Sequence, residues 1–118
     1  MEGTDLQRIR HMLLHCKEVE ASLQRHKDNY EEFLDDHEFY NSICMDILQI
    51  GELSGGLSSV FRDDSSESIP WTSIRAVRNI VAHAYETVQS ARLWEIATED
   101  IPALRAFCEQ TIAEAENT

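Results

Sequence analysis

Positive charge, long hydrophobic runs and strand patterns are all scarce in this chain of 118 residues. Lysine and arginine number 10 against 22 aspartates and glutamates, which gives a formal net charge of −12. That balance argues against nucleic-acid binding through a broad basic surface, and against a long electrostatic track for a duplex. No stretch approaches the apolar length of a membrane span, and the N-terminus lacks a signal peptide's apolar core. We therefore expect a cytoplasmic protein that contacts neither membrane nor DNA.

Several sequence patterns of other fold classes are also missing. We find no alternation of apolar and polar residues, no glycine-rich phosphate loop, no internal repeat and no low-complexity linker. Apolar residues recur instead at steps of three and four, the spacing of amphipathic helices. The length suits one hydrophobic core but not two. The sequence predicts a single all-α domain over residues 1–118, an up-and-down bundle of about five helices.

Cysteine and histidine do not predict a disulfide framework or a metal centre. The cysteines are odd in number, widely spaced and set in apolar helical faces, which indicates buried thiols in a reducing cytoplasm. They are Cys16, Cys44 and Cys108. His11 and His15 are four apart with Glu18 nearby, the spacing of a helical metal pair, but no third ligand is convincing. We expect solvated or half-buried histidines, and no metal or other cofactor.

The first half of the chain predicts long helices. Thr4 or Asp5 is a suitable N-cap for a helix whose apolar stripe continues to Leu23. The acidic segment 28–38 is expected to contain the turn into a second helix. Its acidic residues are explained by the preference of carboxylates for helix N-termini. Residues 39–61 then carry one continuous core-facing stripe. Gly51 within it would weaken a helix, so we expect it to allow close packing against a neighbouring element.

The second half predicts shorter elements around a polar loop. Residues 62–68 form that loop, and Pro70 begins the next helix, because proline is tolerated in a first turn. Ser90 is expected to cap a short helix that runs through Thr98. Asp100 opens the last helix, which carries a further apolar stripe to residue 112.

The stretch Arg78 to Tyr85 concentrates chemically useful side chains within eight residues. It lies on a predicted amphipathic helix whose apolar stripe consists of Ile74, Val77, Val81, Ala84 and Val88. At about 100° per residue, Arg78 and Tyr85 share one edge of that stripe. Asn79 and His83, four apart, lie on the side facing away from it. Another surface must therefore cover or use the face that carries the imidazole.

One copy of this helix separates its own cation from its imidazole. Arg78 and His83 are five apart, so an ideal helix places them about 140° around the axis and about 7.5 Å along it. They can converge if the helix ends or bends near His83, or if a second chain brings its copy opposite. We favour a homodimer, because two-fold symmetry places one patch against itself.

The motif and three flanking elements resemble the HepT-like toxins of the HEPN superfamily. The R-x4-H-x-Y signature is accompanied by I-G-E, I-P-W-x-x-I and W…-L-P-x-L elements in the family's order, over roughly residues 40–112. Gln89 departs from the pattern, standing where the family often has an acid. The flanking elements are Ile50-Gly51-Glu52, Ile69-Pro70-Trp71 with Ile74, and Trp94 with Ile101-Pro102-Ala103-Leu104.

The resemblance implies the toxin of a HEPN–nucleotidyltransferase toxin–antitoxin system, a metal-independent endoribonuclease. Arg78 would bind phosphate oxygens and His83 would transfer protons, because an unperturbed imidazole titrates near neutral pH. Asn79 would orient the imidazole or bind phosphate. Tyr85 would contact the substrate and offer a hydroxyl to which an MntA-like nucleotidyltransferase antitoxin could transfer AMP. Glu52 is expected near the active region.

Charge distribution supports a local site despite the acidic total. Arg75, with Arg62 and Arg92, lies in or near the motif region, so a small positive cleft on an acidic body is expected. Other interpretations stay open at this level. HEPN domains also serve as non-catalytic nucleotide-binding or partner-docking modules, and Tyr85 alone is ordinarily a packing residue with a wet hydroxyl. A third interpretation is a helical bundle with a purely structural role.

Overall fold

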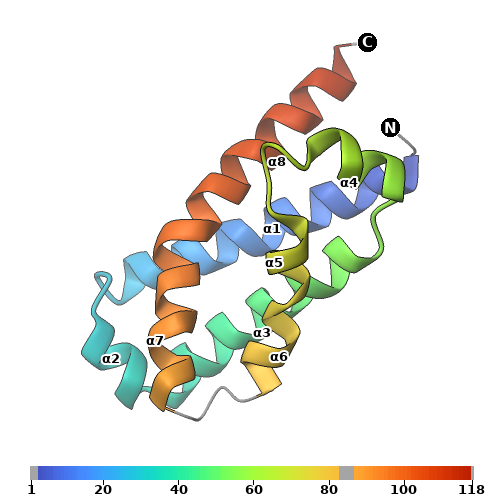
Figure 1. Ribbon diagram of the computed structural model, residues 1–118. Helices are drawn as coiled ribbons and strands as arrows, with labels where there is room; N and C mark the ends of the chain where they lie inside the picture. Colours follow the sequence, from blue (N-terminus) through green and yellow to red (C-terminus); the bar gives the residue numbers. More distant parts are fainter. Residues whose placement is uncertain (1–2, 83–86, 118) are drawn as a thin grey trace.

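The described residues form an all-α structure whose longest helices run antiparallel (Figure 1). The computed structural model describes residues 3–82 and 87–117. Those residues contain no strand, which confirms the predicted all-α class. The helices are α1 (Gly3–Arg25), α2 (Tyr30–Asp35), α3 (His37–Gly55), α4 (Ser59–Ser65), α5 (Trp71–Arg75), α6 (Val77–Ala82), α7 (Thr87–Glu95), the π-helical η1 (Ile96–Asp100) and α8 (Ile101–Glu116).

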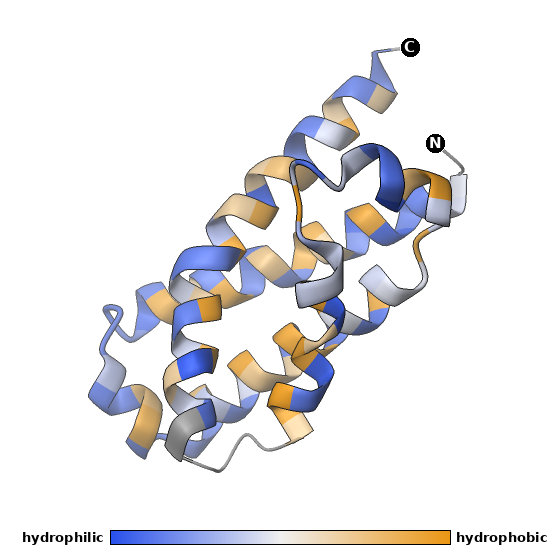
Figure 2. Cartoon of the chain, in the orientation of Figure 1, coloured by the Kyte–Doolittle hydropathy of each residue, from blue (hydrophilic) through white to orange (hydrophobic). Residues whose placement is uncertain are grey.

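Helices α1, α3 and α8 form the body of the bundle, and α1 packs against both of the others. Hydrophobic and hydrophilic positions alternate along each long helix, as amphipathic helices require (Figure 2). The buried side of α1 contributes Ile9, Met12, Cys16 and Val19 to the core. The chain runs down α1, up α3, down α5 and α6, and up α7 to α8, which is the predicted up-and-down topology (Figure 1). None of the described helices combines the length and hydropathy needed to cross a bilayer.

An aromatic cluster fixes α2 and α7 at one end of the bundle. Phe33 is fully buried, and its ring centroid lies 4.6 Å from that of Tyr40 and 5.2 Å from that of Trp94. Aromatic rings at such separations contribute beyond their buried area. Tyr40 also hydrogen-bonds through its hydroxyl to Ser90 Oγ, at 2.9 Å. These contacts hold the start of α7, which follows the motif, against α3.

The helix predicted over 39–61 is two helices, and the polar loop predicted over 62–68 is partly helical. Helix α3 ends at Gly55, and α4 begins after Ser58, whose Oγ accepts a hydrogen bond from the Phe61 amide at 3.2 Å. Asp5 is buried inside α1 and accepts from the Ser58 amide at 2.8 Å and from its hydroxyl at 2.6 Å. The proposed N-cap role of Asp5 or Thr4 is therefore wrong, since both lie within α1. Asp5 instead holds the chain where it turns between α3 and α4.

The expected cap at Ser90 is also wrong. Ser90 lies inside α7, and its hydroxyl meets Tyr40. Helix α7 continues through η1 into α8. Pro102 lacks an N–H and cannot bond to the Thr98 carbonyl, which accounts for the widened π-helical turn before it. The last helix otherwise follows the prediction, with Leu104 and Cys108 buried.

Candidate active site

The motif-bearing segment is anchored to the bundle by Trp71. The indole is buried, and its Nε1 donates to Ser65 Oγ at 2.8 Å. The ring centroid of Trp71 lies 6.1 Å from that of Phe61 and 5.8 Å from that of Phe107. Pro70 stands at the N-cap of α5, as predicted. The element I-P-W therefore acts physically by attaching α5 to both α4 and α8.

Gly51 lets α6 approach α3 closely. A Cβ atom built on Gly51 would lie 2.8 Å from Val77 Cγ2, which is closer than real Cβ contacts. Val77 is buried, and its branched side chain has few rotamers with which to move away. The prediction that Gly51 serves close packing is confirmed. This close packing brings the next residue of α3, Glu52, beside the next residue of α6, Arg78.

Glu52 and Arg78 form an ion pair at the exposed edge of this contact. Arg78 Nε lies 2.7 Å from Glu52 Oε1, and both side chains are about half exposed, at 62% and 48%. An exposed pair of this kind stabilises the fold little. It does fix the guanidinium through Nε, which leaves the four N–H groups of the two Nη nitrogens for another acceptor.

A hollow of about 430 Å³ opens beside this ion pair. Two guanidinium groups, one carboxylate and one hydroxyl line it, and two glycines leave its floor without side chains. Its lining residues are Gly51, Glu52, Gly55, Thr72, Arg75, Ala76 and Arg78. Arg75 and Arg78 stand on opposite sides of Ala76, where α5 ends and α6 begins. The structure thus brings together Glu52, Arg75 and Arg78.

The motif helix is interrupted, in contrast to the continuous stripe predicted from Ile74 onward. Ala76 separates α5 from α6, and the Asn79 amide donates to the Ala76 carbonyl at 3.1 Å. Asn79 is exposed on α6, as its position opposite the apolar stripe predicts. His83 and Tyr85 lie outside the described residues, so their expected roles stay predictions. The described part of the candidate site therefore consists of Glu52, Arg75, Arg78 and Asn79.

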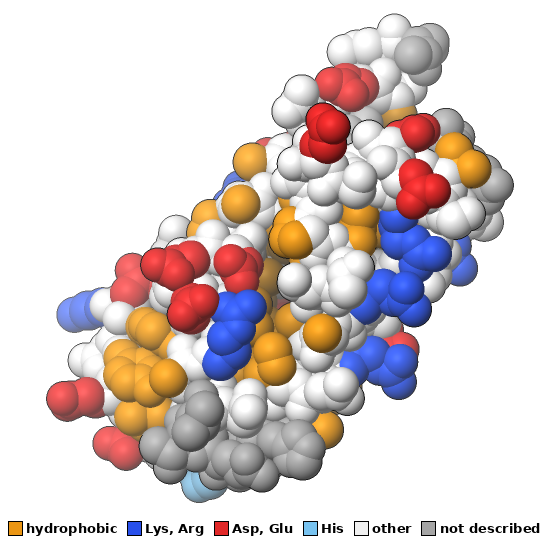
Figure 3. Space-filling view, in the orientation of Figure 1, with side chains coloured by type: hydrophobic (Ala, Val, Ile, Leu, Met, Phe, Trp, Pro, Cys, Tyr) orange, Lys and Arg blue, Asp and Glu red, His pale blue; other side chains and the backbone are white. Residues whose placement is uncertain are grey.

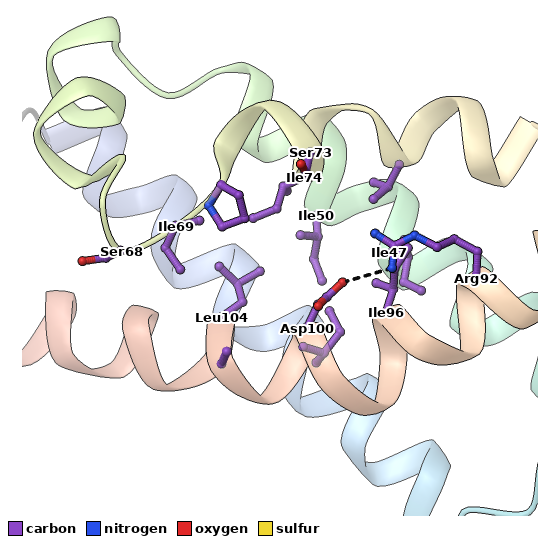
Figure 4. Close-up of a pocket in the computed structure, with 14 residues that line it drawn as sticks. Ile47, Ile50, Ser68, Ile69, Ser73, Ile74, Arg92, Ile96, Asp100 and Leu104 are labelled. Atoms are coloured by element: carbon purple, nitrogen blue, oxygen red, sulfur yellow. Dashed lines mark ion pairs between the residues drawn. The ribbon is translucent and has the colours of Figure 1, made fainter.

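Arg92 does not join this hollow. It lies 2.6 Å from Glu95 Oε1 and 3.6 Å from Asp100 Oδ2, and both distances are measured from Nη1. Arg92 and Asp100 border a separate apolar cavity of about 240 Å³ between α3, α5, α6 and α8 (Figure 4). Isoleucines dominate its lining, among them Ile47 and Ile50. Arg92 is paired with Glu95 and Asp100, so it does not contribute to the predicted positive cleft.

The histidines on α1 behave differently from each other. His11 is exposed, whereas His15 is half-buried and its Nδ1 lies 3.0 Å from Asp46 Oδ1 and 3.5 Å from Glu18 Oε2. One ligand atom from each of His15, Glu18 and Asp46 lies within 4.8 Å of the others. Asp46 is the third group that sequence reasoning lacked. The imidazole hydrogen-bonds to Asp46 and lies within ion-pair distance of Glu18, so these contacts account for the cluster without a metal ion.

The ionisation of Asp46 reflects this packing. Its pKa is raised to about 6 from an ordinary value of 3.8, first by burial and then by the nearby Glu18 carboxyl, while His15 opposes the shift. Burial likewise raises the pKa of the Cys44 thiol to about 11 and that of Cys108 to about 12. All three cysteines are buried and unpaired, as predicted, and they lie apart from the hollow beside Arg78.

The arrangement beside Arg78 suits an anionic ligand that presents two oxygens to a guanidinium group, such as a phosphate. Guanidinium groups bind phosphate in bidentate geometry and keep their charge at every physiological pH. The hollow supplies positive charge and hydrogen-bond donors on a surface that is otherwise strongly acidic.

Comparison with known proteins identifies the family of this chain. The family model described as "Ribonuclease HepT-like" matches residues 6–111. A protein of Methanocaldococcus jannaschii named "Putative RNase MJ1380" is 29% identical over 77 residues, covering 65% of this chain and 70% of that one. A protein of Thermococcus cleftensis named "Probable ribonuclease HepT" is 32% identical over 81 residues, covering 69% of this chain and 73% of that one. No solved structure matches. This chain belongs to the HepT-like ribonuclease family.

Proposed function

We propose that this chain is a metal-independent endoribonuclease that cleaves RNA at a site built from Arg78, Asn79 and His83. The ribose 2′-oxygen attacks the adjacent phosphorus, the bond to the 5′-oxygen breaks, and a 2′,3′-cyclic phosphate forms. One imidazole accepts the proton of the 2′-hydroxyl, and an imidazolium donates a proton to the departing 5′-oxygen. The reaction so written needs no metal ion.

The observation that carries the proposal is the hollow that Arg75 and Arg78 share beside the motif. The transition state places extra negative charge on the nonbridging phosphate oxygens, and fixed cations aimed at that charge lower the barrier. Glu52 holds Arg78 through Nε, which leaves its Nη groups to donate to those oxygens. Arg75 contributes a second cation to the same hollow.

Two histidines are needed for the two proton transfers, and one chain offers a single histidine in the motif. A homodimer supplies the second as His83 of the partner subunit. The exposed face of α6 that carries Arg78 and Asn79 is the surface that would meet its counterpart. Two-fold symmetry would then form two equivalent sites.

The biological role that we propose is that of a toxin restrained by a nucleotidyltransferase antitoxin. Transfer of AMP would form a phosphodiester on the Tyr85 hydroxyl, with release of pyrophosphate from ATP. The added negative charge and bulk would compete with substrate for the guanidinium groups of Arg78 and Arg75. Loss of activity on modification would follow from occupation of the same hollow.

A non-catalytic nucleotide-binding module is the second candidate, and the hollow itself favours it. Its volume of about 430 Å³ and its paired arginines would also suit one nucleotide phosphate that is bound and not cleaved. This candidate and the enzyme differ in whether an imidazole is required. Binding depends mainly on Arg78, whereas cleavage also depends on His83.

The decisive experiment compares His83→Ala with wild type in cells and in purified form. Expressed alone, wild type should arrest growth and cleave total RNA in the presence of EDTA, and His83→Ala should do neither. His11→Ala removes an exposed histidine from α1 and should behave as wild type. Intact RNA with dimeric wild-type protein, or full cleavage by His83→Ala, would refute the enzyme proposal.

The composite site is tested by mixing wild-type subunits with His83→Ala subunits. If each site uses His83 of both subunits, a mixed dimer holds a single imidazole and neither of its sites is complete. Cleavage should then come from wild-type homodimers alone and fall with the square of the wild-type fraction. Cleavage proportional to the wild-type fraction, despite mixed dimers being present, would show that one imidazole per site is enough.

A further inference from the structure

A second hollow adjoins the one beside Arg78 and shares two of its residues. It has a volume of about 480 Å³ and lies between α4 and α5. Thr72 and Arg75 line both hollows, so the two adjoin at these exposed residues of α5. The lining of the second hollow is Arg62, Asp63, Ser66, Ile69, Pro70, Trp71, Thr72 and Arg75.

The cations in this second hollow have no carboxylate partner among the described residues. No ion pair with a described residue involves Arg62 or Arg75, whereas Arg10, Arg92 and Arg105 are each paired with glutamate. Two exposed acids border the path, Glu52 in the first hollow and Asp63 in the second. Figure 3 shows Lys and Arg side chains gathered along one edge of the molecule, with most Asp and Glu of this face elsewhere.

This concentration of unpaired positive charge stands out on a protein of net charge −12. Arginines without a carboxylate partner among the described residues, on a chain whose acids outnumber its bases more than two to one, offer a binding surface to an anion from outside. The base beneath Arg62 and Arg75 is firmly built, since Trp71 is buried and donates to Ser65 on α4. The two arginines thus project from helices whose relative position is fixed.

We propose that Arg62 and Arg75 form a phosphate-binding subsite for single-stranded RNA beyond the scissile linkage. This inference rests on the proposed ribonuclease function, because it continues the path of the substrate that Arg78 binds. The strand passes from the hollow at Arg78 over Thr72 to the hollow at Arg62. Arg75 contacts the phosphate between them, and the Thr72 hydroxyl donates to a phosphate or sugar oxygen.

The subsite selects a single strand because the basic path is narrow and short. A duplex would bring a second row of phosphates toward the surrounding acids, which repel it at moderate salt. One strand can follow the local line of cations and passes only two acids of the path, Glu52 and Asp63. Recognition is through the backbone, so it does not depend strongly on base identity.

The test measures binding of 2′-O-methyl RNA, which cannot be cleaved because its 2′-oxygen carries no proton. Fluorescence anisotropy compares a dinucleotide with an oligomer of about eight nucleotides, within the range of single-strand sites. Arg62→Gln should weaken binding of the longer oligomer about 5- to 10-fold and leave the dinucleotide unchanged. It should also reduce the slope of log affinity against log salt by about 0.7, the loss of one phosphate contact.

Matched variants keep the result interpretable. Arg10→Gln removes the same charge from an exposed arginine on α1 and should leave both affinities unchanged. Arg62→Lys should recover part of the loss, since it keeps the charge and loses the planar fork. Equal oligomer binding by Arg62→Gln and Arg10→Gln would overturn the subsite. Because no cleavage is measured, failure of the proposed catalytic function would be seen separately, in the His83→Ala comparison.

Discussion

The bundle helices and the motif segment are built in opposite ways. α1 and α3 contain 23 and 19 residues and bury a continuous apolar side, whereas α4, α5 and α6 contain 7, 5 and 6. α4 has no buried residue, α5 buries Trp71 and α6 buries Val77. Helices of five to seven residues do not persist alone in water. The bundle therefore supplies the stability, and it holds the short helices at a few points while their polar side chains face outward.

This contrast predicts that stability and activity respond to different substitutions. The largest effect on stability should come from Phe33→Ala in the aromatic cluster, because it removes a fully buried ring. We expect the free energy of unfolding to fall by about 3 to 5 kcal/mol. Urea denaturation measures it, and Leu34→Ala, whose side chain is exposed, is the control. A loss below about 1 kcal/mol for Phe33→Ala would contradict this account of the core.

Gly51→Ala tests the contact that joins the two regions. The added methyl group meets Val77, so we expect a loss of about 1 to 3 kcal/mol in unfolding free energy and reduced RNA cleavage. Gly55→Ala, one turn later on α3, is the matched control, because its new Cβ would lie 3.7 Å from Arg75 Nε and fit. Val77→Ala combined with Gly51→Ala should recover part of the lost stability relative to the sum of the single changes. Additive losses would show that the two residues do not compete for space.

Asp46→Asn tests the buried carboxyl within the bundle. Its folded pKa of about 6 lies above the ordinary value of 3.8, so the folded protein holds a proton that the unfolded chain releases between about pH 4 and 6. The Asp46 contribution to stability therefore falls as pH rises through that window. Relative to wild type, Asp46→Asn should gain about 1 to 3 kcal/mol in unfolding free energy between pH 4.5 and 7.5.

Thermal or urea unfolding at both pH values gives this comparison. His15 and Glu18 face the same carboxyl and remain in place in the variant. Asp35→Asn, at an exposed position of α2, is the control. A constant difference between Asp46→Asn and wild type at the two pH values would show that the Asp46 proton is not linked to folding.

The smallest effect concerns thiol reactivity in the bundle. Burial raises the pKa of Cys44 to about 11, so almost none of it is thiolate at pH 8. We expect iodoacetamide to alkylate none of the three cysteines in the native protein within the time that labels the urea-unfolded chain. Mass spectrometry measures the labelled fraction. Rapid native labelling of Cys44 would show that this side of α3 opens.

The sequence predicts the bundle well because helical periodicity depends on burial, which dominates its energetics. Ile43, Ile47 and Leu104 lie in the core where the pattern places them. The helix break at Gly56 was missed because Leu57 and Phe61 stay in phase with the preceding stripe although the chain turns. Asp5 stabilises that turn from 53 residues away, and no local pattern records such a contact.

The candidate site is only partly predictable for the same reason. Arg78, Asn79 and Glu52 follow from the motif and its flanking elements, and the structure places Glu52 against Arg78. The roles of Gly55 and Thr72 in the hollow were not anticipated. Gly55 follows Gly51 by four residues, so one face of α3 lacks side chains, and that spacing was the available signal. The position of Asp46 beside His15 depends on how α1 crosses α3.

The most direct test of the central claim is the cleavage rate of Arg78→Ala measured together with its unfolding free energy. We expect cleavage to fall about 10²- to 10³-fold, while stability changes by less than about 1 kcal/mol because the ion pair is exposed. Glu52→Gln removes the same ion pair but keeps the cation, and should retain most of the activity. Full activity in Arg78→Ala, or a loss that merely follows unfolding, would contradict the assignment of phosphate binding to this segment.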